Sequence, residues 1–359
     1  MFSARHQPRA LSHRTAAFLR LFIAVSMLGL TSCDDPKKEA EIRWREEEVT
    51  AKEADVAKRE KALQEERKAA ENLQAQIKQQ EAALALREKA LADNEDKIKQ
   101  AKVAWDTKLR RGPAPSTTCE RVVVIDPASD EVYFERNADK RGPIASTTKI
   151  MTALLLVEAG DLDKELTVEE ADTKCAPVRI GLKAGETYTR RDLLTALMVK
   201  SSNDIAQALA RDNAGSLEAF AEKMNKRAAA LGCKNTLYIN PHGLPPLEGQ
   251  PEPYCTPHDL ARIAEEADKL PEIREIVKTK NYDFMLGGKK KIALENTNHV
   301  LRTCAWCDGM KTGFTEAAGH CLVATGERDG KRRIVVVLNG NSTNVWKDAQ
   351  SLLEWSLKY

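Results

Sequence analysis

The segment from Glu39 to Arg110 restricts the possible folds of this chain most strongly, because it contains neither proline nor glycine. Alanine, glutamate, lysine, arginine and glutamine dominate it, which is typical of a long helix. Apolar residues recur at every seventh position, and such a strict spacing favours a left-handed helical seam. These residues are Ile42, Val49, Val56, Leu63, Ala70, Ile77, Leu84, Leu91, Ile98 and Trp105. The sequence therefore predicts a helix over 39–110, with a length of about 100 Å at 1.5 Å per residue.

The second seam position of this repeat is mostly polar. It is occupied by Arg45, Lys52, Arg59, Glu66, Leu73, Gln80, Arg87 and Asn94. A stable coiled-coil dimer needs apolar residues at both positions. Two interpretations stay open: a weak or partner-assisted coiled coil that self-associates through this segment, or a single solvated helix held by ion pairs four residues apart. In both, the helix is a stalk that acts as a spacer.

The first 33 residues have the layout of an export signal. Arginines precede an apolar run over 21–30, which is too short to span a bilayer but suits the apolar core of a signal peptide. The run ends in Leu-Thr-Ser-Cys, which is similar to the bacterial lipobox, in which the cysteine, here Cys33, becomes lipidated. Ordinary cleavage with Cys33 as a bystander is the alternative. We expect residues 1–33 to be a lipoprotein signal, and the chain to be exported and anchored by lipid to a bacterial membrane, facing the periplasm or cell envelope.

Export would permit disulfides among the cysteines that follow Cys33. Their number is odd, so at least one stays free or pairs outside the chain. They are Cys119, Cys175, Cys233, Cys255, Cys304, Cys307 and Cys321. Cys233 and Cys255 flank a loop rich in proline and glycine and could close it. Cys304 and Cys307 form a single CxxC motif, which fits a redox pair, half of a metal site or a strained disulfide; with no second CxxC and no nearby histidine pair, we expect no metal and no cofactor.

Residues 111–118 contain Gly-Pro-Ala-Pro and mark a linker, and 119–359 have the length of one domain. Strands are expected over 121–125, 131–134, 310–314, 320–325 and 333–338. Helices are expected near Ser146, over 192–197, 204–210 and 217–231, after Thr256, and over 344–357. Strands at both ends around a helical middle predict an α+β fold, with one mainly antiparallel sheet and helices packed on it. The formal net charge of +2 gives no reason to expect a nucleic-acid partner.

Ser146 and Lys149 form an SxxK motif at the start of a predicted helix. This spacing places the lysine one turn from the serine on the same helix face. A serine hydroxyl needs a nearby base to become a nucleophile, and a desolvated lysine with a lowered pKa can serve as that base. The motif alone is weak, because an N-capping serine and a surface lysine would give the same pattern.

Two further motifs follow in order. Ser201-Ser202-Asn203 lies after an apolar helix, and Lys311-Thr312-Gly313 lies in a strand-like segment before Phe314. Enzymes that bind penicillin through an active-site serine carry SxxK, SxN and KTG in this order. With the surrounding stretches 143–152, 225–244 and 308–313, residues 119–359 resemble the low-molecular-weight penicillin-binding proteins of the D-alanyl-D-alanine carboxypeptidase family. The resemblance does not extend to the stalk.

The resemblance implies the fold of serine β-lactamases and D,D-peptidases, peptidoglycan peptides as substrates and β-lactam antibiotics as covalent inhibitors. It also implies a role for each site residue. Ser146 would attack the carbonyl of the penultimate D-Ala, and Lys149 would take the proton of its hydroxyl. Ser201 would relay a proton to the leaving group, and Asn203 would hold both the peptide amide and Lys149. Lys311 and Thr312 would bind the terminal carboxylate, Gly313 would let the substrate approach the strand, and the N–H groups of Ser146 and Phe314 would form the oxyanion hole.

Three features depart from the family pattern. Ser202 stands where many relatives have glycine or alanine, and we expect this to be tolerated. The C-terminal β-rich domain and amphipathic anchor of many members are not expected here, where lipid and stalk would replace the anchor. Cys304 and Cys307 have no counterpart in the family pattern.

Other functions fit the sequence less well. A class A β-lactamase needs a deacylating glutamate in an ExxLN loop, and the segment 235–243 has none. A metallopeptidase of the HExxH type is excluded because the motif is missing. A D,D-endopeptidase that cleaves peptidoglycan cross-links would use the same residues and is the main alternative. A peptidoglycan-binding lipoprotein without catalysis is a more distant one.

Overall fold

The computed structural model describes residues 36–358. They fall into two parts, divided at Lys99 and Gln100, which are described separately below. The predicted signal segment 1–33 with Cys33 lies outside the described residues. No helix among residues 36–358 is both long enough and apolar enough to cross a membrane.

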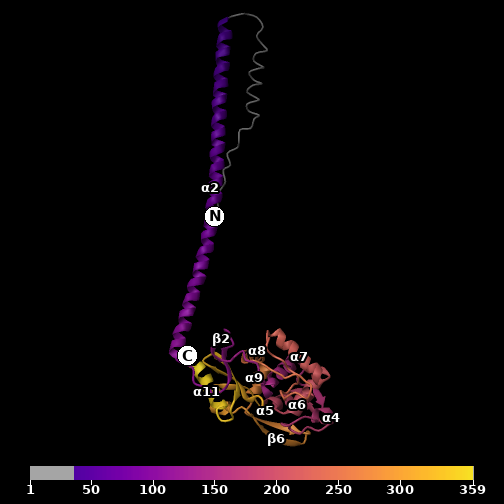
Figure 1. Ribbon diagram of the computed structural model, residues 1–359. Helices are drawn as coiled ribbons and strands as arrows, with labels where there is room; N and C mark the ends of the chain where they lie inside the picture. The colour runs from indigo at the N-terminus through magenta and orange to yellow at the C-terminus, as the bar shows by residue number, and fades with distance from the viewer. Residues whose placement is uncertain (1–35, 359) are drawn as a thin grey trace. The chain divides into compact units, whose positions relative to one another are not determined.

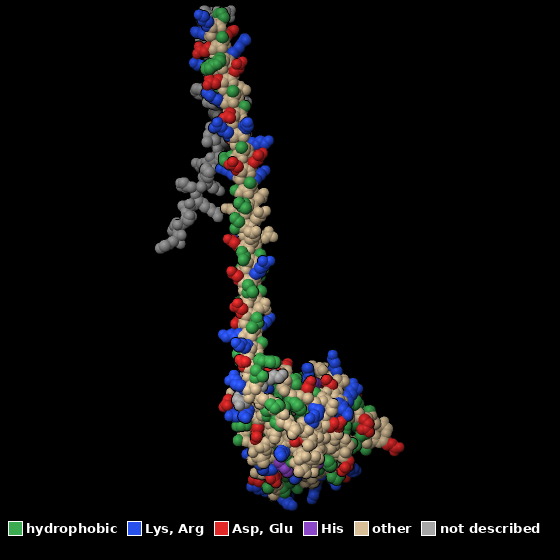
Figure 2. Space-filling view, turned by 60° about the vertical axis from the view of Figure 1, so that its left-hand side comes forward, with side chains coloured by type: hydrophobic (Ala, Val, Ile, Leu, Met, Phe, Trp, Pro, Cys, Tyr) green, Lys and Arg blue, Asp and Glu red, His purple; other side chains and the backbone are tan. Residues whose placement is uncertain are grey.

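The long N-terminal helix is confirmed as α2 (Pro36–Arg111), whose 76 residues correspond to about 114 Å. The apolar seam residues Ile42, Val49 and Leu63 are exposed in the single chain. Ion pairs four residues apart accompany them, such as Glu41–Arg45 at 2.9 Å and Glu48–Lys52 at 2.6 Å. Figure 2 shows apolar and charged side chains alternating along this helix. Self-association through the helix therefore stays a prediction.

A five-stranded antiparallel sheet forms the centre of the second part, in the order β2-β1-β9-β8-β7. Its strands are β1 (Arg121–Asp126), β2 (Glu131–Arg136), β7 (Cys307–Thr315), β8 (Gly319–Arg328) and β9 (Lys331–Gly340). The central strands are rich in valine and are buried on both faces, which suits a sheet covered by helices on each side. All five strands expected from the sequence are thus confirmed, and β7 and β2 are the two edge strands of this sheet within the described part of the chain.

Helices cover both faces of this sheet (Figure 1). One face and its core, which includes Val123 and Val336, packs against most of the helices. These are η1 (Ala145–Thr148), α3 (Lys149–Glu158), α5 (Arg190–Lys200), α6 (Asn203–Ala214), α7 (Leu217–Ala230), α8 (Pro257–Asp268) and α9 (Pro271–Val277). The short α4 (Glu170–Thr173) contacts α6. The other face, with Val122 and Val337, packs against α10 (Val300–Thr303) and α11 (Val345–Ser356). The α+β fold is confirmed.

The helical middle also contains two antiparallel strand pairs that were not expected from the sequence. These are β3 (Glu165–Thr167) with β4 (Thr187–Thr189), and β5 (Asn281–Leu286) with β6 (Lys290–Glu295). The second pair is a hairpin that turns through Gly287 and Gly288, both at positive φ. Most of its side chains are exposed and only Phe284 and Leu294 are buried, so its apolar pattern is weak.

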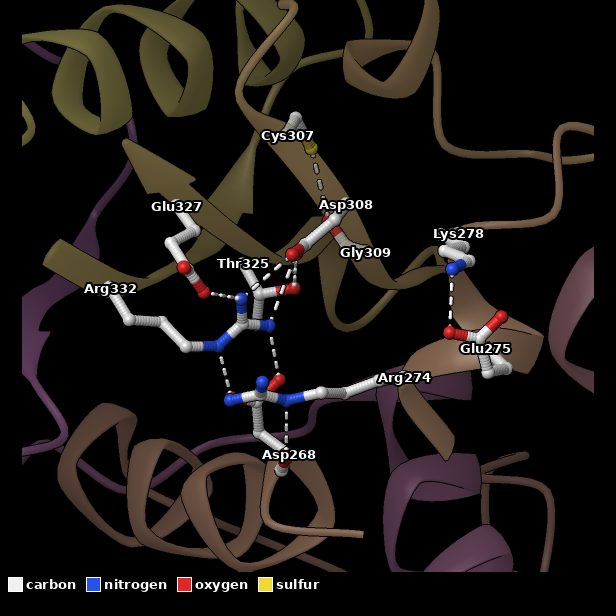
Figure 3. A network of polar contacts seen from close by, with 10 residues as sticks. All are labelled: Asp268, Arg274, Glu275, Lys278, Cys307, Asp308, Gly309, Thr325, Glu327 and Arg332. Carbon is white, nitrogen blue, oxygen red and sulfur yellow. Dashed lines mark hydrogen bonds and ion pairs between the residues drawn. The ribbon is translucent and has the colours of Figure 1, made fainter. Parts of the chain in front are cut away.

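A buried charge network ties β7 and β9 to helix α8 (Figure 3). The Arg332 guanidinium forms a bidentate ion pair with Asp268 and a second ion pair with Asp308 at 2.7 Å. Arg274 also contacts Asp268, at 3.1 Å. Asp268 is 2% exposed, so its charge depends on these partners. The network fixes the start of β7 against the helical layer.

Replacing Arg332 by methionine is expected to lower the free energy of unfolding by about 3 kcal/mol, because removing one partner of a buried ion pair leaves an uncompensated charge. Urea denaturation measures this effect. Arg191→Met is the matched control, since the exposed Arg191 forms an ion pair with the exposed Asp163 at 2.9 Å, and we expect a change of about 0.5 kcal/mol or less. Equal losses of stability in both variants would contradict the stabilising role of the buried ion pair between Arg332 and Asp268.

Candidate active site

Ser146 lies in a tight turn ahead of a helix. The sequence predicted a helix beginning near Ser146, whereas a 3₁₀ turn, η1, holds the serine and α3 begins only at Lys149. The loop 240–244 packs against this turn. A Cβ at Gly243 would lie 1.9 Å from the Ala145 carbonyl oxygen, and φ of Gly243 is +78°. Only glycine allows this approach. The turn thereby presents a half-buried Ser146 side chain.

Lys149 is the buried centre of the polar contacts around Ser146. Its Nζ lies 2.8 Å from Ser146 Oγ, 2.8 Å from Asn203 Oδ1 and 3.0 Å from the His242 carbonyl oxygen. The side chain is completely buried. Burial, and secondly the charge of Lys311, hold the pKa of Lys149 well below its usual value. These are the conditions under which a lysine is a neutral base.

The SxN motif spans the junction between α5 and α6. Ser201 ends α5 in a left-handed conformation, with φ of 69°, and Asn203 is the first residue of α6. While Asn203 Oδ1 contacts Lys149, its Nδ2 donates to the Pro177 carbonyl at 2.9 Å. The hydroxyls of Ser201 and Ser202 are buried without a hydrogen-bond partner among the described residues. A buried hydroxyl of this kind at the site is available to a bound ligand.

The KTG motif lies on β7 beside the serine turn. Lys311 is buried, and burial lowers its pKa to about 7. The Thr312 hydroxyl is 2.7 Å from that of Thr297. A Cβ at Gly313 would lie 2.8 Å from the Ser146 nitrogen and 3.0 Å from the Thr147 nitrogen. The missing side chain of Gly313 therefore allows β7 to pass directly beside the nucleophile.

Phe314 follows on the same strand and is 51% exposed. Its ring centroid lies 4.4 Å from that of His320 on β8. Because β7 is an edge strand, its outer backbone groups can pair with an extended ligand. The structure thus brings Ser146, Lys149 and Asn203 into one hydrogen-bonded group and places Gly313 of β7 against it.

Sequence reasoning missed two supporting contacts. Asp204 accepts hydrogen bonds from the backbone N–H groups of Ile180, Gly181 and Leu182, at 2.9 to 3.2 Å, and so holds the loop that carries Pro177. The His242 carbonyl contacts Lys149 directly. Burial lowers the pKa of the His242 ring to about 3, so the ring is neutral. The Asp that follows SxN directly, and the Asn-Pro-His-Gly run, were the available signals.

The cysteines of the described chain carry free thiols. Cys233 and Cys255 are therefore not joined, and their thiols contact the Asp259 carbonyl and the Thr236 hydroxyl instead. Cys321 is also a buried thiol. Within residues 36–358, no group of His, Cys, Asp and Glu has an arrangement that would hold a metal ion.

Comparisons with known proteins agree with this geometry. A family model described as D-alanyl-D-alanine carboxypeptidase matches residues 109–342. The D-alanyl-D-alanine carboxypeptidase DacF of Bacillus subtilis is 37% identical over 234 residues, which cover 64% of this chain and 59% of DacF. A D-alanyl-D-alanine endopeptidase of Pseudomonas aeruginosa is 32% identical over 245 residues, which cover 65% of this chain and 75% of the relative. Penicillin-binding protein D2 of Listeria monocytogenes, solved in its ampicillin-bound form, has a TM-score of 0.59 and 31% identity, covering 68% of this chain and 99% of that one.

Proposed function

The chain belongs to the D-alanyl-D-alanine carboxypeptidase family, and from this premise we propose that it is a serine-type carboxypeptidase that removes the terminal D-Ala from peptidoglycan stem pentapeptides. One observation carries the proposal: the completely buried Lys149 amine lies 2.8 Å from both Ser146 Oγ and Asn203 Oδ1. A lysine in this position has no solvent to stabilise its charge and can act as the general base for Ser146.

The contacts of Lys149 define which way the proton moves. A neutral amine has two N–H groups and one lone pair. Asn203 Oδ1 and the His242 carbonyl only accept hydrogen bonds, so they take the two N–H groups. The lone pair is then left for the Ser146 hydroxyl, which donates its proton as Oγ attacks the carbonyl carbon of the penultimate D-Ala. The backbone N–H groups of Ser146 and Phe314 stabilise the oxyanion that forms.

Collapse of this intermediate breaks the peptide bond. The leaving D-Ala nitrogen receives the proton from Lys149 through the Ser201 hydroxyl, which is buried and unpartnered among the described residues. Lys149 is thereby neutral again, and the remaining peptide is an ester of Ser146. In the second half-reaction, a water gives a proton to Lys149 and attacks the ester carbonyl, and Ser146 Oγ leaves with that proton.

The strand β7 binds and orients the peptide. The cationic Lys311 and the Thr312 hydroxyl bind the terminal carboxylate, since these groups neighbour Gly313 beside the nucleophile. The peptide backbone pairs with the free edge of β7 as an added strand. Gly313 has no side chain that would separate this backbone from Ser146.

A defined pentapeptide that ends in D-Ala-D-Ala tests the proposal. Mass spectrometry of the products is expected to show the tetrapeptide and free D-Ala with the full chain, and neither with the Ser146→Ala variant. Release of D-Ala by Ser146→Ala at the rate of the parent chain would refute a serine mechanism. Cleavage at another bond would refute the substrate assignment.

The two buried lysines predict a dependence of kcat/KM on pH. Lys149 must be neutral, and burial holds its pKa well below the usual value, so this base is lost only as the pH falls through that lowered pKa. Lys311 must be charged to bind a carboxylate, and burial lowers its pKa to about 7. We therefore expect kcat/KM to fall as the pH rises above about 7. In Lys311→Arg the guanidinium stays charged and the alkaline fall disappears; an unchanged fall in this variant would contradict the role of Lys311.

Endopeptidase activity on peptide cross-links is a second candidate function, favoured by the similarity to the endopeptidase of Pseudomonas aeruginosa. The same nucleophile would cut a D-Ala amide whose leaving group is a second stem peptide. Purified cross-linked muropeptide dimers distinguish the two: conversion to monomers indicates an endopeptidase, and release of D-Ala from pentapeptides alone indicates a carboxypeptidase.

We also propose that Cys33 carries lipid and that the helix α2 serves as a spacer between the membrane and the catalytic domain. The lipobox-like sequence supports the anchor, and a helix of 76 residues supports the spacer. Metabolic labelling with a fatty-acid analogue is expected to tag the full chain and not Cys33→Ser. Equal labelling of both would refute lipidation at this cysteine.

A further inference from the structure

The turn between α10 and β7 contains the CxxC motif, which the proposed mechanism leaves unused. The Cys307 N–H donates to the Cys304 carbonyl with an N–O distance of 3.3 Å. A four-residue turn closed by this bond brings its first and last Cα atoms within about 7 Å. Disulfides bridge Cα separations of about 4.4 to 6.8 Å. The two cysteines are thus held at a distance that a disulfide can close.

This turn is directly connected to the start of β7. The Cys307 thiol donates to the Gly309 carbonyl, with a distance of 3.2 Å from Sγ to the oxygen (Figure 3). Asn298 Nδ2 donates to the same carbonyl at 2.9 Å. Asp308, which lies between Cys307 and Gly309 in the sequence, is held by Arg332 and by the Thr325 hydroxyl, the latter at 2.8 Å. Any change at Cys307 therefore acts on a backbone segment that is fixed on both sides.

The carboxylate-binding residues follow immediately along this strand. Lys311 and Thr312 are separated from Gly309 only by Met310, which is itself buried. A strand with one fixed end transmits a local shift along its length, because packed interiors have little free volume to absorb it. The position of Lys311 and Thr312 thus depends on the geometry of the turn 304–307.

We propose that Cys304 and Cys307 form a reversible disulfide that controls the alignment of β7, and hence the binding of the substrate carboxylate. This inference rests on the proposed function for its effect on binding, although the disulfide itself does not. Oxidation forms the Sγ–Sγ bond and removes two protons and two electrons from the thiols. A second disulfide, of a thiol–disulfide exchange protein or a small molecule, accepts them and becomes two thiols.

Disulfide formation would change the contacts of β7 in a defined way. It removes the S–H group that donates to the Gly309 carbonyl, so the start of β7 loses one of the two donors that hold this carbonyl. The oxidant has a route to the thiols, because Ala305 at the tip of the turn is exposed, although Cys304 and Cys307 are 4% and 8% exposed. Burial also raises the pKa of the Cys307 thiol to about 12, so uncatalysed exchange in the folded chain is slow.

The full chain, treated with dithiothreitol or with oxidised glutathione and a thiol–disulfide exchange protein as catalyst, tests this proposal. Each form is alkylated and digested, and cysteine pairing is mapped by mass spectrometry. We expect a peptide linked through Cys304 and Cys307 after oxidation, and a rate constant of acylation by a fluorescent penicillin at least roughly threefold lower than in the reduced form. Cys304→Ser keeps the Cys307 thiol and is expected to acylate at the reduced rate under both conditions, as is Cys304→Ala.

Cys175→Ser is the matched control, because Cys175 is the most accessible of the described cysteines; it is expected to respond to oxidation as the parent chain does. Two results would overturn the proposal: Cys304 and Cys307 both alkylated after oxidation, or equal acylation rates in the oxidised and reduced forms. Failure of the proposed serine mechanism, on which the effect rests, looks different, since the reduced parent chain would then not react with penicillin at all.

Discussion

Replacing Lys149 by methionine is expected to lower the rate constant of acylation at Ser146 on the order of 10⁴-fold, the upper end of the effect of a general base. Methionine has a similar length, so the buried space stays filled. It has neither a lone pair basic enough to take the Ser146 proton nor N–H groups for Asn203 Oδ1 and the His242 carbonyl. The variant therefore loses the proton acceptor and also the group that holds Asn203 in place.

Fluorescent penicillin, followed by gel over time, measures the acylation rate of Lys149→Met. Lys278→Met is the matched control, because Lys278 pairs with Glu275 on the surface at 2.6 Å and lies outside the active site. It should acylate like the parent chain. Circular dichroism establishes that Lys149→Met is folded. A folded Lys149→Met that acylates within tenfold of the parent would contradict the assignment of Lys149 as the base.

Replacing Gly313 by alanine is expected to reduce acylation roughly 10²-fold, as misplacement of reacting groups by about 1 Å does. The added Cβ would lie 2.8 Å from the Ser146 nitrogen and 3.0 Å from both the Ile144 oxygen and the Thr147 nitrogen. All three are backbone atoms, which cannot rotate away. Either β7 or the serine turn must move, and the nucleophile then loses its alignment with the strand that binds the substrate.

Overpacking also destabilises a protein, by about 1 to 3 kcal/mol, so the control must separate stability from catalysis. Gly340→Ala serves this purpose. Its Cβ would lie 2.7 Å from Cys119 Sγ and 3.5 Å from Val345 Cβ, in the apolar cluster on the face of the sheet that packs against α11. We expect both variants to have a lower melting temperature and only Gly313→Ala to lose acylation. Equal acylation losses would show that general destabilisation, not the site, is responsible.

The sheet was predictable because its strands are encoded locally. Val122 to Val124 and Val335 to Val337 are short buried apolar runs bounded by turns, and such runs identify strands without knowledge of their partners. The β5 and β6 hairpin was missed because most of its side chains are exposed, so its pattern carries little apolar signal. The 3₁₀ turn at Ser146 was missed because its geometry comes from Gly243, distant in sequence, which packs against Ala145.

In the active site too, contacts between residues close in sequence were predictable, and contacts between residues distant in sequence were not. The proximity of Ser146 and Lys149 follows from their spacing of three residues, which a helical turn converts into contact. The contacts that make Lys149 a base depend on Asn203 and His242, which only the fold brings together. The charge network of Asp268, Asp308 and Arg332 could not be predicted either, because charged residues are normally expected at the surface and not in a buried network.

Intact-protein mass spectrometry after exposure to benzylpenicillin determines whether Ser146 is the nucleophile. We expect the parent chain to gain the mass of one penicilloyl group, located by peptide mapping on the peptide that contains Ser146. Ser146→Ala, folded by circular dichroism, should gain no mass. A penicilloyl group on Ser146→Ala, or on a different residue of the parent chain, would show that Ser146 is not the nucleophile.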